Sequence, residues 1–184
     1  MPDSGPRLET ERLVLRVPQR CDFDGFAEML GDAEAARYIG GAASREAAWR
    51  RFLQMPGAWS VQGFAMFAVT DKRTGEWLGQ TGPWQPEGWP GTEVGWSFRR
   101  SAWGHGYAFE AAIAAIDWAF AHLGWSEVIH CIDPANRRSR ALAERLGSRV
   151  LRRAHLPAPY DDEAVDVWGQ TRVEWYAQHP QPAN

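Results

Sequence analysis

The chain has 184 residues, enough for one domain of ordinary size with a sizeable core. Apolar residues make up 45% and charged residues 23%, which is the balance of a soluble globular protein. The net charge of −3 argues against a nucleic-acid-binding protein, because such proteins need a basic face.

The sequence indicates neither a membrane segment nor a metal site. The most apolar stretch, 108–123, is interrupted by two acidic residues and is too short to span a bilayer. The first six residues are polar and lack the apolar core of a signal peptide. Cys21, Cys131 and the five histidines show no metal-ligand spacing. We therefore expect a cytoplasmic protein with reduced thiols and with no metal and no membrane partner.

The first third of the chain predicts one strand and two helices. Alternating apolar residues predict a strand within 8–17. Asp22 or Asp24 can cap a first helix, which Gly31 closes. A second helix is expected to begin after Ser44 and to end before Pro56.

Strand character dominates the next third. Three runs are rich in apolar and β-branched residues, at 63–70, 76–82 and 92–98. The segment 71–75 between the first two reads as a hairpin turn. The proline-rich segment 82–91 is expected to form a loop rather than a strand.

The last third alternates helices and strands. Helical spacing of small alanines predicts a helix over 107–123 that can lie close to a sheet. The expected elements after it are a strand at 125–132, a helix at 136–146, and strands at 150–153 and 164–172. Strands before and after a central strand–helix–strand unit predict a mixed α/β sheet in a single domain over residues 1–184.

The informative local motif is Trp103-Gly104-His105-Gly106-Tyr107-Ala108, placed between a strand and a helix. Glycines leave backbone N–H groups uncovered, and a helix N-terminus adds the positive end of its dipole, so the loop suits a diphosphate. A purely structural turn explains the two glycines equally well. The loop is not a dinucleotide fingerprint, because Phe109 replaces the third glycine, and it is not a P-loop, because no Gly-Lys-Ser/Thr follows.

Further motifs follow in a fixed order around this loop. They are Glu93-Val94-Gly95-Trp96, Glu110-Ala111, Asp133-Pro134-Ala135-Asn136-Arg137-Arg138-Ser139 and Glu144-Arg145-Leu146-Gly147. Together with Leu8–Arg16 they resemble the GNAT superfamily of N-acetyltransferases, in its RimJ/RimL-like branch. The resemblance covers nearly the whole chain. It implies a mostly antiparallel, twisted sheet of six to seven strands flanked by helices, with a splay between the two central strands.

The resemblance also implies that acetyl-CoA is the co-substrate. Backbone groups of Trp96, Ser97 and Phe98 would pair with the pantetheine arm, and Asn136 would bond the same arm. Trp103 would belong to the coenzyme-binding loop, and the pyrophosphate would lie on the N–H groups of Gly104, His105, Gly106, Tyr107 and Ala108. Arg99, Arg100 or Arg140 could reach the 3′-phosphate, although solvated surface arginines are the simpler interpretation.

The implied chemistry is transfer of an acetyl group to a primary amine by direct attack in a ternary complex. Glu93 is the candidate base, through a water or on an amine of low pKa, because a free glutamate of pKa about 4.3 is a weak base for a lysine near 10.4. Many relatives place a tyrosine acid seven residues after the asparagine, where this chain has Ala143. A phenylalanine of the family is replaced by Ser148. Ser139 is therefore the candidate to protonate the departing thiolate.

The sequence predicts the acceptor less clearly than it predicts the coenzyme. Among the 11 tryptophans, Trp84 and Trp89 are the ones we expect to line an acceptor pocket. The acidic turn 161–163 could attract a cationic acceptor, and His105 is expected to face solvent. The acceptor would be a protein N-terminus or a small amine, and the enzyme a monomer or a homodimer.

Three other interpretations stay open. Glu93 could be no more than a polar residue on a partly exposed strand. Because Ala143 and Ser148 depart from the family pattern, the chain could be a non-catalytic acyl-CoA-binding or sensing module. The third interpretation is a nucleotide-binding regulatory domain, and the glycine loop alone supports it.

Overall fold

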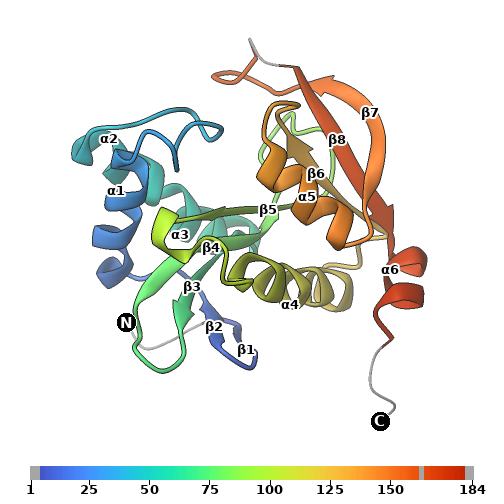
Figure 1. The fold of residues 1–184 in the computed structure, drawn as a ribbon, viewed down its shortest axis with the longest axis horizontal. Helices are drawn as coiled ribbons and strands as arrows, with labels where there is room; N and C mark the ends of the chain where they lie inside the picture. Colours follow the sequence, from blue (N-terminus) through green and yellow to red (C-terminus); the bar gives the residue numbers. More distant parts are fainter. Residues whose placement is uncertain (1–4, 162–163, 181–184) are drawn as a thin grey trace.

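The structure is a computed structural model that describes residues 5–161 and 164–180. In this part of the chain, eight strands form one sheet in the order β1–β2–β3–β4–β5–β6–β8–β7 (Figure 1). The strands are β1 (Arg7–Glu9), β2 (Leu13–Arg16), β3 (Phe67–Asp71), β4 (Trp77–Trp84), β5 (Glu93–Phe98), β6 (Glu127–Ile132), β7 (Arg149–His155) and β8 (Ala164–Thr171). Neighbouring strands run antiparallel except β5 and β6, which run parallel. The predicted mixed, mostly antiparallel sheet is confirmed.

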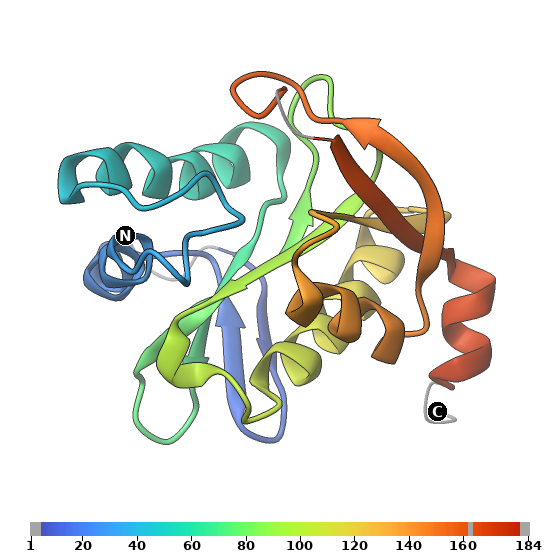
Figure 2. The ribbon, with the colours of Figure 1, turned by 45° about the horizontal axis from the view of Figure 1, so that its top comes forward.

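Helices cover both faces of this sheet. They are α1 (Phe23–Gly31), α2 (Arg45–Phe52), α3 (Gln54–Gln62), α4 (Tyr107–His122), α5 (Arg137–Arg145) and α6 (Arg172–Gln178), with short 3₁₀ turns at Arg20–Asp22 and Arg100–Ala102. Figure 2 shows α1 and α2 on one side of the sheet and α4 and α5 on the other. Within the described residues, no helix is long and apolar enough to cross a membrane.

The two faces have separate cores because strand side chains alternate in direction. Phe67 and Val69 of β3 pack with α4, whereas Ala68 between them packs with α1 and α2. The buried alanines of α4 carry no bulk and let the helix lie close to the sheet, as predicted: Ala111, Ala112, Ala115 and Ala119.

The strand count differs from the predicted six to seven because the first run, 8–17, breaks into two strands. Thr10 N–H bonds the carbonyl of Leu13 at 3.0 Å, and the Leu13 N–H bonds Thr10 Oγ1 at 3.0 Å. These two bonds close a turn, so β1 and β2 pair as a hairpin.

Of the two predictions that rested on proline, the loop at 82–91 was wrong in its first residues, whereas the end of the second helix before Pro56 is confirmed, because α2 ends at Phe52. Strand β4 continues through Pro83 to Trp84, within the predicted loop. Pro83 lies opposite Val94 on β5 and beyond the start of β3, where the ladder needs no N–H from it. Helix α3 contains Pro56 in its first turn, where helical N–H groups have no intrahelical acceptor.

Helix α6 was not predicted, although its start carries a recognisable signal. Thr171 and Glu174 form a reciprocal capping box, in which each side chain accepts from the other residue's N–H. Of the acidic turn 161–163, residues 162 and 163 lie outside the described residues.

Candidate functional site

A gap opens in the middle of the sheet between the parallel strands β5 and β6. The two strands pair only at Glu93 and Ile129. One end of the gap is closed by a 3.0 Å bond from the Ile129 N–H to the Thr92 carbonyl, and beyond it the strands separate. The structure therefore contains a splay between central strands, as the family resemblance implies.

The ladder between β4 and β5 decides which backbone groups face this gap. The Arg99 N–H bonds the Leu78 carbonyl at 3.0 Å, and residues of an antiparallel pair alternate in direction from such a bond. The N–H and C=O of Ser97 therefore point toward β4, and those of Trp96 and Phe98 point into the gap. Trp103 Nε1 already donates to the Phe98 carbonyl at 2.9 Å. The expected pantetheine contact through the Ser97 backbone is thus corrected: Trp96 offers both groups and Phe98 its N–H.

The glycine loop at the start of α4 presents uncovered amides. Gly104 and Gly106 both have φ of +79°, which non-glycine residues rarely adopt. The first bond of the helix runs from the Glu110 N–H to the Gly106 carbonyl at 3.1 Å, so the amides of Tyr107 and Ala108 precede the helical ladder. His105 is exposed between the two glycines, as predicted. This geometry suits an anion at the N-terminus of α4.

Glu93 is the titratable group at the closed end of the gap, and its burial rules out the partly exposed strand position considered above. Its side chain is 6% exposed. Oε1 accepts the Cys131 N–H at 3.0 Å, and Oε2 accepts a bond from Trp89 Nε1. Burial raises the pKa of Glu93 to about 7, against the lowering effect of these two bonds.

The structure brings Trp84 and Trp89 to the face of the sheet that carries Glu93. Trp84 lies directly opposite Glu93 in the β4–β5 register. The rings of Trp84 and Trp89 meet edge to face with centroids 6.4 Å apart. We call this the Glu93 face.

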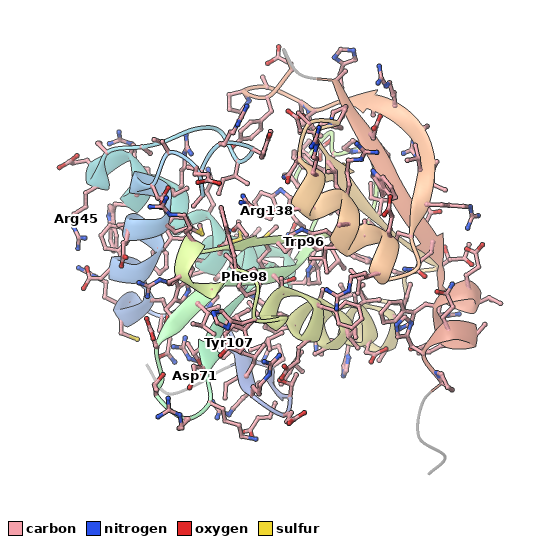
Figure 3. All side chains as sticks on the ribbon, viewed as in Figure 1. Arg45, Asp71, Trp96, Phe98, Tyr107 and Arg138 are labelled. Carbon is pink, nitrogen blue, oxygen red and sulfur yellow. The ribbon has the colours of Figure 1, made fainter. Side chains whose placement is uncertain are left out.

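Ser139 and Asn136 lie on the other side of the sheet, which we call the α4/α5 face. Side chains alternate along β5, so Trp96 points away from Glu93 and toward α5. Trp96 Nε1 donates to Ser139 Oγ at 3.1 Å. Asn136 caps α5, because its Oδ1 accepts the Ser139 N–H at 3.2 Å. Figure 3 shows the labelled Trp96 and Arg138 beside α5. Glu93 and Ser139 are therefore on opposite faces, joined only through the gap.

The comparison with known proteins fits this arrangement. A family model described as acetyltransferase (GNAT) domain matches residues 12–149. The chain belongs to the GNAT acetyltransferase family. The uncharacterized protein YkkB of Bacillus subtilis strain 168 is 33% identical over 82% of this chain and 91% of its own length. The uncharacterized N-acetyltransferase p20 of Bacillus licheniformis is 30% identical over 76% of this chain and 80% of its own.

Solved structures show the same fold. An acetyltransferase from Agrobacterium tumefaciens C58 is 31% identical, with a TM-score of 0.79 over 92% of this chain and 96% of that one. Two structures with named acceptors match at lower identity, which shows the fold alone. They are the ribosomal-protein-S5-alanine acetyltransferase of Vibrio fischeri (18%, TM-score 0.71, 92% and 98% covered) and the aminoglycoside acetyltransferase AAC(6')-Ib in complex with coenzyme A (17%, TM-score 0.71, 91% and 99% covered).

Within this GNAT domain, Glu110 anchors the glycine loop rather than meeting a ligand. Its carboxylate accepts the Arg12 N–H at 2.8 Å and Arg12 Nε at 2.7 Å, and Arg12 Nη1 donates to the His105 carbonyl at 2.9 Å. Partial burial raises the pKa of Glu110, but bonds from Thr10 and Arg12 outweigh it and hold the pKa below its usual value. The β1–β2 turn is thereby tied to the start of α4.

The arginines considered for a 3′-phosphate are already engaged. Arg99 pairs with Glu28 at 3.0 Å and with Glu76 at 2.6 Å. Arg100 pairs with Asp32 at 2.8 Å. Arg140 Nη1 donates to the carbonyl of residue 134 at 3.2 Å. Contact with a 3′-phosphate stays a prediction, because ion pairs hold Arg99 and Arg100, whereas the buried Arg140 Nε has no hydrogen-bond partner within the described residues.

His130, which sequence reasoning set aside, lies next to the gap on β6. Its Nδ1 is 2.7 Å from the Val94 carbonyl and its Nε2 is 3.1 Å from Ser148 Oγ. Burial lowers its pKa to about 4, so the ring is neutral at pH 7. In the sequence, the one sign of this position of His130 is the alternation of side chains within 127–132, which directs residue 130 inward. Its partners follow only from the register of β6 with its neighbours.

Two further features of the site concern the Cys131 thiol and possible metal ligands. Burial and the charge of Glu93 raise the pKa of the Cys131 thiol above its usual range, so the thiol is unreactive. Residues 5–161 and 164–180 contain no group of three or more His, Cys, Asp or Glu side chains that could hold a metal ion.

Proposed function

We propose that this GNAT protein is an acetyl-CoA-dependent N-acetyltransferase of the RimJ/RimL-like branch, which acetylates a primary amine by direct attack in a ternary complex. The observation that carries the proposal is the buried Glu93 carboxyl, with a pKa near 7, at the closed end of the gap between β5 and β6. A group of this pKa at such a place suits a general base at neutral pH.

The residues of the α4/α5 face fit a coenzyme. The Trp96 N–H and C=O point into the gap, where an amide-bearing pantetheine arm would pair with them. Asn136 uses its Oδ1 as a helix cap, which leaves its Nδ2 as a donor for the same arm. Amides from Gly104 to Ala108 would hold the pyrophosphate, and nothing lies within 4 Å of a side chain built on Gly104.

Glu93 would take the proton that the amine loses. At pKa about 7 roughly half of it is ionised at pH 7, whereas a free glutamate is a far weaker base. The carboxylate already meets Trp89 Nε1, the Cys131 N–H and the Cys131 thiol, and an ionised carboxylate, with about four lone-pair sites, keeps one more for the amine or for a bridging water. Alignment of amine and thioester supplies up to about 7–11 kcal/mol of the barrier reduction.

Ser139 would act on the other side of the gap, at the leaving sulfur. A serine hydroxyl is a much weaker acid than a thiol, so we assign it a hydrogen bond to the developing thiolate rather than a full proton transfer. Such a bond to a charged group is stronger than one between neutral groups. The departing CoA then takes its proton from solvent.

The acceptor class follows from the Glu93 face. Trp84 and Trp89 would form its walls, and a base of pKa near 7 is matched to an α-amine near 7.7–8.0 better than to a lysine near 10.4. We therefore place protein N-termini and low-pKa small amines ahead of lysine side chains. Two of the fold neighbours are named as a ribosomal-protein-S5-alanine acetyltransferase and an aminoglycoside acetyltransferase, so the screen includes both kinds of acceptor. We expect a cytoplasmic monomer or homodimer.

The test is an acceptor screen that measures release of the free CoA thiol from acetyl-CoA across N-terminal peptides, aminoglycosides and small amines. We expect release with at least one class, and an acetyl-CoA-dependent rise of the melting temperature by mass action. The competing proposal, a non-catalytic acyl-CoA sensor, rests on Ala143 in the place of the family tyrosine. It predicts the rise in melting temperature with no CoA release for any amine. No shift at millimolar acetyl-CoA would overturn both.

A further inference from the structure

The clearest unexplained contact of the site is the bond between the Trp96 indole and the Ser139 hydroxyl. The two residues are 43 positions apart and come from β5 and α5. Trp96 Nε1 donates to Ser139 Oγ at 3.1 Å. A hydroxyl that accepts a bond keeps its own hydrogen to donate elsewhere. The indole therefore occupies a lone pair of Ser139 and leaves its proton directed away from Trp96.

Ala143 explains why an indole fits here. Ser139 and Ala143 are one helical turn apart, so they share a face of α5. Ala143 is fully buried in a cluster with Ile132 and Trp168, and Trp96 packs against this cluster. A tyrosine at position 143 would need space that these indoles occupy. In this structure the Trp96 indole packs against the Ala143 cluster and reaches Ser139.

The ring of Trp96 is in turn held by a buried polar network. The His130 ring lies against it, with centroids 4.6 Å apart. Because a carbonyl can only accept, the His130 Nδ1–H donates to Val94, and the neutral Nε2 accepts from the Ser148 hydroxyl. Gln170 Nε2 donates to Ser148 Oγ at 3.0 Å. The Val94 carbonyl thus fixes the tautomer of the ring, and Ser148, the second departure from the family pattern, helps to hold the orientation of the ring against Trp96.

We propose that Trp96 is a positioning residue that holds the Ser139 hydroxyl as a hydrogen-bond donor to the sulfur of CoA. The inference rests on the proposed function and deepens it. When the C–S bond of the tetrahedral intermediate breaks, its electron pair goes to sulfur, and Ser139 donates its hydrogen bond to the thiolate that forms. The Trp96 indole donates its N–H to Ser139, so the side chain acts on the sulfur through Ser139, separately from the backbone groups of Trp96 that face the pantetheine arm.

The test compares three variants with a matched control. Trp96→Phe removes the N–H and keeps an aromatic ring, and Ser139→Ala removes the hydroxyl; the double variant combines them. Trp168→Phe is the control, because this indole is buried in the same cluster but its Nε1 has no hydrogen-bond partner within the described residues. The readouts are kcat, the dissociation constants of acetyl-CoA and CoA, and the pKa of the enzyme-bound CoA thiol, followed by the ultraviolet absorbance of the thiolate.

We expect Trp96→Phe to lower kcat about tenfold, the effect of one hydrogen bond to a group that gains charge, with less than a twofold change in acetyl-CoA affinity. Ser139→Ala should lower kcat at least as much, and the double variant no further than Ser139→Ala alone. The bound thiol should titrate about one pH unit higher in both single variants than in the wild type. Trp168→Phe should match the wild type in every readout.

Additive losses in the double variant would overturn the inference, and so would a Trp96→Phe variant that matches Trp168→Phe. If phenylalanine at 96 prevents folding, Ser139→Ala decides the matter: an unchanged pKa of the bound thiol contradicts the proposal. The thiol titration needs no turnover. An absence of CoA release in the wild type would therefore overturn the proposed function separately, while the titration still tests the contact to sulfur.

Discussion

Glu93 and His130 lie on neighbouring central strands, and both are buried, yet only one of them titrates near neutrality. Burial raises the pKa of Glu93 to about 7 and lowers that of His130 to about 4. In each case the low-dielectric surroundings favour the neutral form. The consequence differs because the ordinary values differ: Glu93 is moved into the physiological range and His130 is moved out of it.

The two faces of the sheet therefore suit different steps of the proposed reaction. The Glu93 face carries a carboxyl poised to exchange a proton. The α4/α5 face carries the Trp96 indole, which is hydrogen-bonded to the Ser139 hydroxyl, and the neutral His130 ring, which packs against that indole and is held by the Val94 carbonyl and Ser148. Proton chemistry is expected on the first face, and binding and orientation of the coenzyme on the second.

The largest expected effect comes from removing the charge on the Glu93 face. Glu93→Gln keeps the shape and the bond from the Cys131 N–H, and it should lower kcat by about 10²–10⁴-fold because a general base is lost. Acetyl-CoA affinity, measured by calorimetry, should stay within twofold. Glu127→Gln, at an exposed acid on β6, is the control and should behave as the wild type. Equal kcat in Glu93→Gln on the true acceptor would make the base assignment wrong.

A smaller effect is expected from the glycine loop on the α4/α5 face. Gly104→Ala meets no steric contact, so its cost is the left-handed backbone alone, about 1–2 kcal/mol. If the strain shifts the loop amides, acetyl-CoA affinity should fall about fivefold to thirtyfold with kcat at saturation nearly unchanged. Gly57→Ala in α3, also in open space but without positive φ, should leave affinity untouched. Loss of kcat without loss of affinity in Gly104→Ala would contradict the coenzyme role of the loop.

The smallest expected effect is on stability, where the two groups oppose each other. The unfolded state binds more protons than folded His130 between pH 4 and 6.5, so this histidine makes stability fall as the pH drops through that window. Folded Glu93 binds more protons than the unfolded state between pH 4.5 and 7, so it makes stability fall as the pH rises there. Each slope is at most about 1.4 kcal/mol per pH unit.

Urea denaturation at pH 5, 6 and 7 separates these slopes. Glu93→Gln removes the opposing contribution, so its unfolding free energy should rise with pH more steeply than that of the wild type. His130→Gln should show the reverse. Identical pH slopes in all three proteins would show that neither pKa is shifted in the folded state.

The sequence predicted most elements where the signal is local. The helical spacing of alanines in α4, the glycines of the loop and the Asn136 cap are readable within one turn of the chain. Local rules also produced the errors: they do not predict α3, which carries Pro56 in its first turn, and they end β4 before Pro83, which lies where the ladder needs no N–H.

The parts of the site that the sequence does not predict are contacts between residues far apart in the chain. The bond from Trp96 to Ser139 joins two elements, and the network of His130, Ser148 and Gln170 depends on the register between β6 and its neighbours. The exclusion of the Ser97 backbone from the gap likewise follows from the β4–β5 register alone. Such contacts need the fold before they can be stated.

The most direct test of the central claim is the pH dependence of kcat for wild type and Glu93→Gln, with the acceptor that the screen identifies and saturating acetyl-CoA. The wild type should lose activity about tenfold per pH unit below an apparent pKa near 7, because Glu93 must be ionised to take the proton. The residual activity of Glu93→Gln should lack this limb. The same limb near pH 7 in both proteins would contradict the account, because the ionisation would then belong to another group.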